Sequence, residues 1–158
     1  MIAIKTIVLP TDFSACSRKA LTYAVSFAKQ YGARLVALHV IDRRWEDQGR
    51  YVLLEIGEEA LQRARKGYEE EAHRMLKEVA DAAATAGVTI ETLLVTGLPF
   101  EDIVRVAKEL PADLIIMGTH GRTAGAHALL GSVAERVVRR APCPVLTVRH
   151  KEHDLVIT

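Results

Sequence analysis

The sequence lacks the features that mark membrane, secreted and metal-binding proteins. It has two cysteines in 158 residues, Cys16 and Cys143, and their separation fits neither a metal site nor a redox pair. We therefore expect both to be buried, reduced thiols. No apolar run approaches the roughly 18 residues of a membrane span, and the apolar amino-terminal segment lacks the basic region of a signal peptide. These absences predict a cytoplasmic protein that does not enter a membrane.

Neither sign of charge is in excess. The 21 basic and 20 acidic side chains leave a formal net charge of +1, so no broad attraction to nucleic acid or to an anionic membrane is expected. Any anion-binding site must therefore be local. At this length we expect one domain over residues 1–149, followed by a tail over 150–158 that adds a strand at the sheet edge or folds back over it.

Apolar, β-rich runs alternate with helical periodicity along the chain. Strands are predicted over residues 4–9, 34–40, 88–95, 113–117 and 145–148. Helices are predicted over residues 14–31, 55–86, 99–110 and 132–140, and residues 41–54 are interpreted as a mobile loop. This order predicts an α/β fold with an open, five-stranded parallel sheet and helices on both faces. The second helix would be about 45 Å long and should extend past the sheet.

The most informative segment lies between the fourth strand and the last helix. Gly118, Gly121 and Gly131, followed by Ser132, form a G-x2-G-x9-G-S spacing. A strand, a glycine-rich loop and a helix amino terminus together favour phosphate binding, because backbone N–H groups can approach an anion and the helix end carries about half a positive charge. Ser132 and Glu135 match a capping box, which predicts that Ser132 caps the helix. Either its hydroxyl caps while neighbouring N–H groups bind phosphate, or the hydroxyl itself contacts phosphate.

A second loop rich in polar residues follows the first strand. In parallel sheets, ligands bind at the carboxyl ends of the strands where the strand order reverses. If the first and fourth strands are neighbours, as in an order 3-2-1-4-5, this loop and the glycine loop face one crevice. Asp12 would then accept hydrogen bonds from a sugar or a base, unless it only caps the helix that begins near Ser14. Because phosphates repel a carboxylate, Asp12 must lie at the nucleoside end or share a cation with the phosphates.

Several segments of the chain resemble the universal stress protein family, in particular its nucleotide-binding subgroup. The similarity covers nearly the whole chain and is carried by residues 7–14, 37–40, 118–132, 132–138 and 141–148. The glycine spacing is similar to the family's ATP-binding signature, without a gap. The resemblance implies a Rossmann-like sheet of the adenine nucleotide alpha hydrolase type, in the order 3-2-1-4-5. It also implies a homodimer that pairs the last strands, Val145–Val148.

The same resemblance implies ATP in the crevice, with ADP or AMP as alternatives and Mg²⁺ bound with the phosphates. Asp12 would contact the adenosine beside Pro10 and Thr11, and the backbone of Val40 would meet the adenine. The ribose and phosphates would be held by the glycine loop and the helix start, through Gly118, Gly121, Arg122, Gly131, Ser132 and Val133. Met117 completes the predicted nucleotide-binding set. Arg122 would screen phosphate charge, unless it is a solvated loop arginine.

The predicted function is a nucleotide-dependent regulatory or stress-response module with an unidentified protein partner. The alternative is a slow or partner-activated ATPase. The sequence has no G-x-x-x-x-G-K-[ST] segment and no evident carboxylate or glutamine to position a water molecule. A third interpretation, an interaction protein that no longer uses its pocket, is disfavoured by the intact glycines. Gly131→Val is predicted to abolish ATP binding while leaving the fold largely native.

Overall fold

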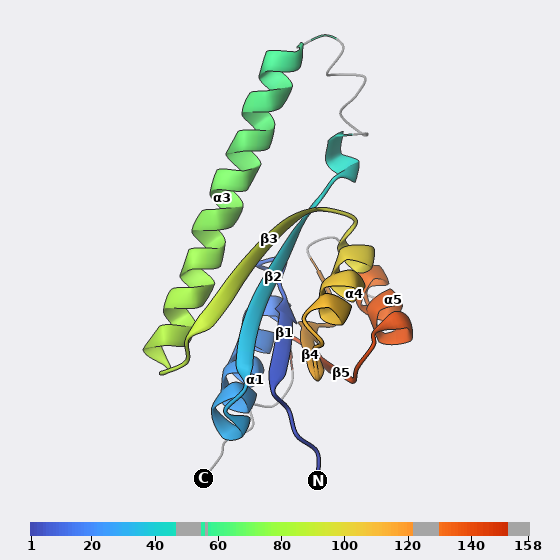
Figure 1. The fold of residues 1–158 in the computed structure, drawn as a ribbon. Coiled ribbons are helices and arrows are strands. Elements are labelled where there is room, and N and C mark those ends of the chain that lie inside the picture. Colours follow the sequence, from blue (N-terminus) through green and yellow to red (C-terminus); the bar gives the residue numbers. More distant parts are fainter. Residues whose placement is uncertain (47–54, 56, 122–129, 152–158) are drawn as a thin grey trace.

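The protein is built on one parallel sheet of five strands (Figure 1). The computed structural model describes residues 1–46, 55, 57–121 and 130–151. The sheet has the order β3-β2-β1-β4-β5, and its strands are β1 (Thr6–Pro10), β2 (Arg34–Asp42), β3 (Ile90–Gly97), β4 (Leu114–Gly118) and β5 (Val145–Val148). The predicted fold class and strand order are confirmed.

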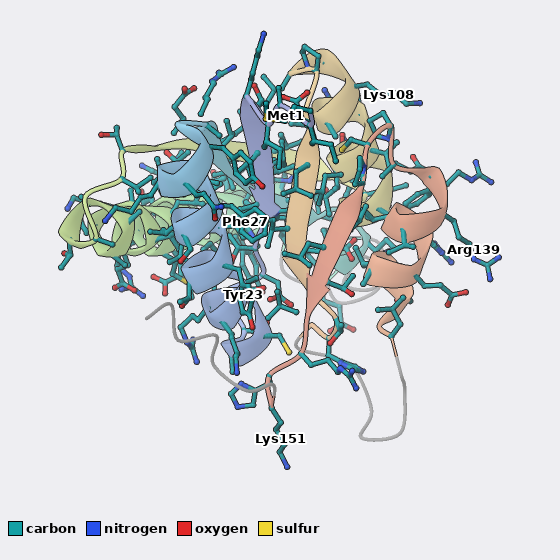
Figure 2. The ribbon with its side chains drawn as sticks, turned by 90° about the horizontal axis from the view of Figure 1, so that it is seen from below. Met1, Tyr23, Phe27, Lys108, Arg139 and Lys151 are labelled. Atoms are coloured by element: carbon teal, nitrogen blue, oxygen red, sulfur yellow. The ribbon has the colours of Figure 1, made fainter. Side chains whose placement is uncertain are left out.

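Helices cover both faces of this sheet, as predicted. The core on one face contains α1 (Ala15–Tyr31) and α3 (Glu58–Thr85), and the core on the other contains α4 (Pro99–Glu109) and α5 (Ser132–Arg140). Figure 2, which views the molecule from below, shows the two layers on either side of the strands. Lys108 of α4 and Arg139 of α5 point away from the sheet in this view, as expected for the solvated faces of amphipathic helices.

The central strand β1 explains why the chain begins with a nearly continuous apolar run. Ile7, Val8 and Leu9 are each fully buried. Ile7 and Leu9 pack in the core on the α1 and α3 side, whereas Val8 packs in the core on the α4 and α5 side. Because successive side chains of a strand point to opposite faces, a strand covered on both sides needs apolar residues at every position.

The region after β2 differs from the prediction. β2 continues to Asp42, two residues beyond the predicted end, because Ile41 and Asp42 still pair with β3. Residues 44–46 then form a helical turn. The predicted mobile loop is therefore wrong for residues 41–46, and its remainder, residues 47–54, lies outside the described part of the chain.

Helix α3 has 28 residues, which corresponds to a length of about 42 Å. Its first turns extend past the end of the sheet, as predicted (Figure 1). Within the described ranges, no helix is both long and apolar enough to cross a membrane. Both cysteines are free, and Cys16 is buried as expected. Cys143 is only partly buried, and this burial raises the pKa of its thiol.

Candidate functional site

A cavity of about 610 Å³ lies at the carboxyl ends of β1, β2 and β4. β1 lies between β2 and β4, at the point where the strand order reverses. The first turn of α5, the start of α4 and the middle of α3 complete the walls. Ligand pockets in proteins typically measure about 300–1,000 Å³, so this cavity is large enough for a nucleotide-sized molecule.

The structure brings ten of the eleven predicted nucleotide-binding residues to this one cavity. They are Pro10, Thr11, Asp12, Val40, Met117, Gly118, Gly121, Gly131, Ser132 and Val133. The eleventh, Arg122, lies outside the described residues. The loops after β1 and β4 therefore face one crevice, as predicted from the strand order. Which portion of a nucleotide each residue contacts stays a prediction.

Asp12 is held at the amino terminus of α1 and also lines the cavity. Its Oδ1 atom accepts hydrogen bonds from the Ser14 N–H at 3.0 Å and from the Ser17 hydroxyl at 2.7 Å. Its Oδ2 atom lies 2.5 Å from the position that a β-carbon would take at Gly121. Asp12 therefore caps the start of α1, which was the alternative to ligand binding. The same carboxylate also reaches the glycine loop at Gly121.

The turn around Asp12 is fixed by contacts on both sides. Phe13 has a φ of 64°, a region that bulky residues rarely adopt. Its N–H donates to the Thr11 hydroxyl at 3.1 Å, and its ring centroid lies 4.5 Å from that of His39. The Nδ1 atom of His39 in turn lies 2.7 Å from the Thr11 carbonyl oxygen. These contacts hold a strained backbone in one conformation, so Asp12 has a defined position at the cavity.

The amino terminus of α5 opens onto the cavity. Gly131 is the capping residue and offers no side-chain hydrogen bond, and Glu135 is the first residue to make a helical hydrogen bond, from its N–H to the Gly131 carbonyl at 2.9 Å. The N–H groups of Ser132, Val133 and Ala134 precede that bond and have no partner within the helix. All three residues line the cavity. The arrangement presents backbone donors and the positive end of a helix dipole to a ligand.

The predicted capping box at Ser132 is wrong. Ser132 is the first helical residue rather than the cap, because the Gly131 N–H donates to the Thr119 carbonyl at 2.6 Å and the helix starts from that junction. A β-carbon added at Gly131 would lie 2.9 Å from the same carbonyl oxygen. Gly131→Val would therefore displace the backbone of this loop, and the expectation that the rest of the fold stays largely native in this variant remains a prediction.

Gly118 is required by packing rather than by a ligand. A β-carbon at this position would lie 2.7 Å from the Cys16 β-carbon and 3.0 Å from the Cys16 carbonyl carbon. The end of β4 thus passes directly against α1, and only glycine fits there. Two glycines of the motif, Gly118 and Gly131, are therefore explained by the protein's own backbone, while Gly121 lies against the carboxylate of Asp12.

The charged side chains of the described lining are engaged by contacts within the protein. Arg44 is the only arginine or lysine among the described lining residues. Its Nε donates to Asp42 at 2.9 Å, and this guanidinium lowers the pKa of the Asp42 carboxyl. Glu71 accepts a hydrogen bond from the Arg74 Nε at 2.9 Å. The described residues contain no group of three or more side chains suited to hold a metal. Since Arg44 is paired with Asp42, the open end of α5 is the main uncompensated positive feature of the described lining.

The aromatic wall of the cavity was not predicted. Trp45, which was not among the predicted nucleotide-binding residues, lines the cavity with its ring centroid 4.7 Å from that of Tyr68. Tyr68 stands on the part of α3 that approaches the turn after β2. The two residues are distant in sequence, and no local periodicity relates them, so the sequence carried no signal of the pair.

Comparison with known proteins identifies the class. Residues 3–149 match the model of the universal stress protein family, and the chain belongs to that family. It is 40% identical over 150 residues to universal stress protein MJ0531 of Methanocaldococcus jannaschii, which covers 95% of this chain and 85% of that one.

Solved structures agree with this assignment. MJ0577, a universal stress protein of the same organism, superposes with a TM-score of 0.80 at 32% identity, covering 96% of this chain and 100% of that chain. A universal stress protein solved in complex with cAMP superposes with a TM-score of 0.68 at 28% identity, covering 95% of this chain and 100% of that chain.

Proposed function

We propose that this chain is an ATP-binding universal stress protein that acts as a nucleotide-dependent regulatory or stress-response module. The observation that carries the proposal is the open amino terminus of α5, which faces a cavity of about 610 Å³ at the carboxyl ends of the strands. The relative that binds cAMP supports an adenine nucleotide as the class of ligand. ATP, ADP and AMP all share the base and a terminal anion that such a site would take.

In this proposal the phosphates accept hydrogen bonds from the N–H groups of Ser132 and Val133, and Arg122 screens their charge. Asp12, beside Pro10 and Thr11, contacts the sugar hydroxyls. The Val40 backbone meets the adenine at the end of β2. Mg²⁺ is held chiefly by the phosphates, because the described residues offer no group of three or more metal-binding side chains.

The contacts around the cavity favour binding over hydrolysis. Phosphoryl transfer to water needs a group that orients the attacking molecule. The carboxylates of the described lining are already engaged: Asp12 by Ser14 and Ser17, Asp42 by Arg44, and Glu71 by Arg74. We therefore expect turnover to be slow, or to require a partner that supplies the missing group.

Two copies of the chain are proposed to pair through β5. This strand pairs with β4 on one side, and in the described part of the chain no strand covers its other side. An uncovered strand edge favours pairing with another chain, and a two-fold dimer is its simplest form. Sedimentation equilibrium tests this directly: the mass of a dimer is expected, and a monomer at micromolar concentration would contradict it.

The nucleotide function is tested by identifying what the purified protein carries. Freshly purified protein is denatured, and released nucleotides are identified by mass spectrometry. ATP supports the binding function, whereas mainly ADP supports hydrolysis. Calorimetric titration with ATP and Mg²⁺ provides the second test. No heat and no rise in melting temperature at millimolar ATP would overturn the proposal.

A further inference from the structure

The only tryptophan of the chain stands in the cavity wall with its polar atom unused. Trp45 lines the cavity, and its Nε1 is the one buried side-chain nitrogen or oxygen without a hydrogen-bond partner among the described residues. Because this nitrogen is itself buried, a ligand in the cavity meets the rest of the indole ring rather than the N–H.

The position of the indole is fixed by its neighbours in sequence. Arg44, which precedes it, is held by the ion pair to Asp42. Glu46, which follows it, accepts hydrogen bonds from the Arg65 Nε at 2.9 Å and Nη2 at 2.8 Å. The first pair anchors the turn to the end of β2, and the second anchors it to α3. The indole is thus placed before any ligand arrives.

The ring itself packs on α3. Its centroid lies 4.7 Å from that of Tyr68, with the two planes tilted by 43°. Both rings line the cavity, so together they form an aromatic surface on its β2 side. Such a surface suits a flat heteroaromatic ring, because aromatic groups stack on one another with offset or tilted geometry.

This aromatic surface and the open end of α5 lie on opposite sides of the cavity. The turn that carries Trp45 follows β2, α5 follows β4, and β1 lies between those strands, so the strands that lead to the two features are two strand spacings apart, roughly 10 Å. In Figure 1 the turn lies beyond the upper end of β2, beside the projecting part of α3, whereas α5 lies lower, next to α4. An elongated ligand with its anionic end on α5 would direct its other end toward Trp45.

We propose that Trp45 and Tyr68 recognise the base of the bound nucleotide. The base packs against these two rings, with the offset or tilted geometry in which aromatic groups stack on one another. This inference rests on the nucleotide function proposed above and adds the residues that select a purine-like ring. The Val40 backbone, five residues earlier at the end of β2, contacts the same end of the ligand.

Because Trp45 is the only tryptophan, its fluorescence reports on this contact directly. ATP is expected to change the emission on binding, whereas inorganic tripolyphosphate, which has no base, is expected to bind at α5 and leave the emission unchanged. Calorimetry of the same samples separates the possible failures. ATP heat without a change of emission overturns the assignment of Trp45 alone, and absence of ATP heat overturns the nucleotide function and this inference with it.

A substitution removes the aromatic surface. Trp45→Leu keeps an apolar side chain and is expected to weaken ATP binding about twofold to tenfold, as the loss of one aromatic stacking contact predicts, with tripolyphosphate binding unchanged. Tyr31→Leu, which removes an exposed aromatic ring of α1 outside the cavity, is the matched control. Wild-type ATP affinity in a folded Trp45→Leu protein contradicts the inference. Should that variant fail to fold, the emission of the wild-type protein still decides.

Discussion

Replacing Ser132 by proline removes one N–H group from the open end of α5 and leaves the helix able to form. Ser132 is the first residue of α5, and the first helical hydrogen bond is donated by Glu135, so no helical bond is lost. Gly131 has φ −65° and ψ 156°, the extended conformation that a residue before proline adopts. Proline is also favoured at the first helical position. The free energy of unfolding should therefore stay the same or rise by about 0.4–1 kcal/mol.

The effect on binding should be large. A hydrogen bond to a charged group contributes about 1.5–3 kcal/mol, so the loss of this donor is expected to weaken ATP binding roughly 10- to 150-fold. The proline ring carbon also occupies the place of the lost hydrogen and holds a phosphate further from the helix. Stability and affinity should therefore change independently.

Ser132→Ala is the matched control, because it removes the hydroxyl and keeps the N–H. Calorimetric titration with ATP and Mg²⁺, together with thermal melting, should give a clear order: the alanine variant loses less affinity than the proline variant, and neither melts earlier than the wild type. A proline variant that folds normally and binds ATP with wild-type affinity would refute the assignment of the α5 terminus as the phosphate site.

Three further predictions concern stability. Gly118→Ala should destabilise the protein by about 1–3 kcal/mol in urea unfolding, because its β-carbon would meet Cys16 at 2.7 Å; wild-type stability would contradict this close approach. Leu76→Ala should cost about 2–5 kcal/mol in the same assay, since Leu76 is 1% exposed in the core under α3, and a loss well below that range would show that the core refills the space. Asp113 accepts two backbone N–H bonds at the amino end of β1, which lower its pKa below the ordinary 3.8. Asp113→Asn should therefore lower the melting temperature at pH values above 3.8, where the wild-type carboxyl is ionised. The difference in melting temperature between wild type and variant should vanish as the pH falls through the lowered pKa. A difference that stays constant with pH would exclude this cause.

The strands and the loops that form the cavity could be predicted because local patterns carry them, whereas the strand order was implied by the resemblance to the universal stress protein family. Ile7, Val8 and Leu9 are apolar at every position because both faces of β1 are covered. The glycine spacing and the polar turn around Asp12 mark the two loops that meet at the reversal of strand order. Each of these signals lies within a few residues of the feature that it predicts.

The remaining features depend on contacts between distant segments. The start of α5 is decided by the hydrogen bond from the Gly131 N–H to the Thr119 carbonyl, which overrides the local pattern of Ser132 and Glu135. The extension of β2 is decided by its pairing with β3. The aromatic pair joins Trp45, in the turn after β2, to Tyr68 in α3. None of these contacts can be predicted from the residues next to each other in the sequence.

The helices α1 and α5 both begin at the cavity edge of the sheet, and they differ in one respect. The Ser17 N–H near the start of α1 already donates to the Ser14 hydroxyl at 3.3 Å, whereas α5 has no such side-chain cap. Of these two helix starts, only that of α5 presents an uncapped positive pole to the rim. A molecule with a negative group at each end finds a counterpart at α5 and none at α1, so the crevice distinguishes head from tail in whatever lies between these two helices.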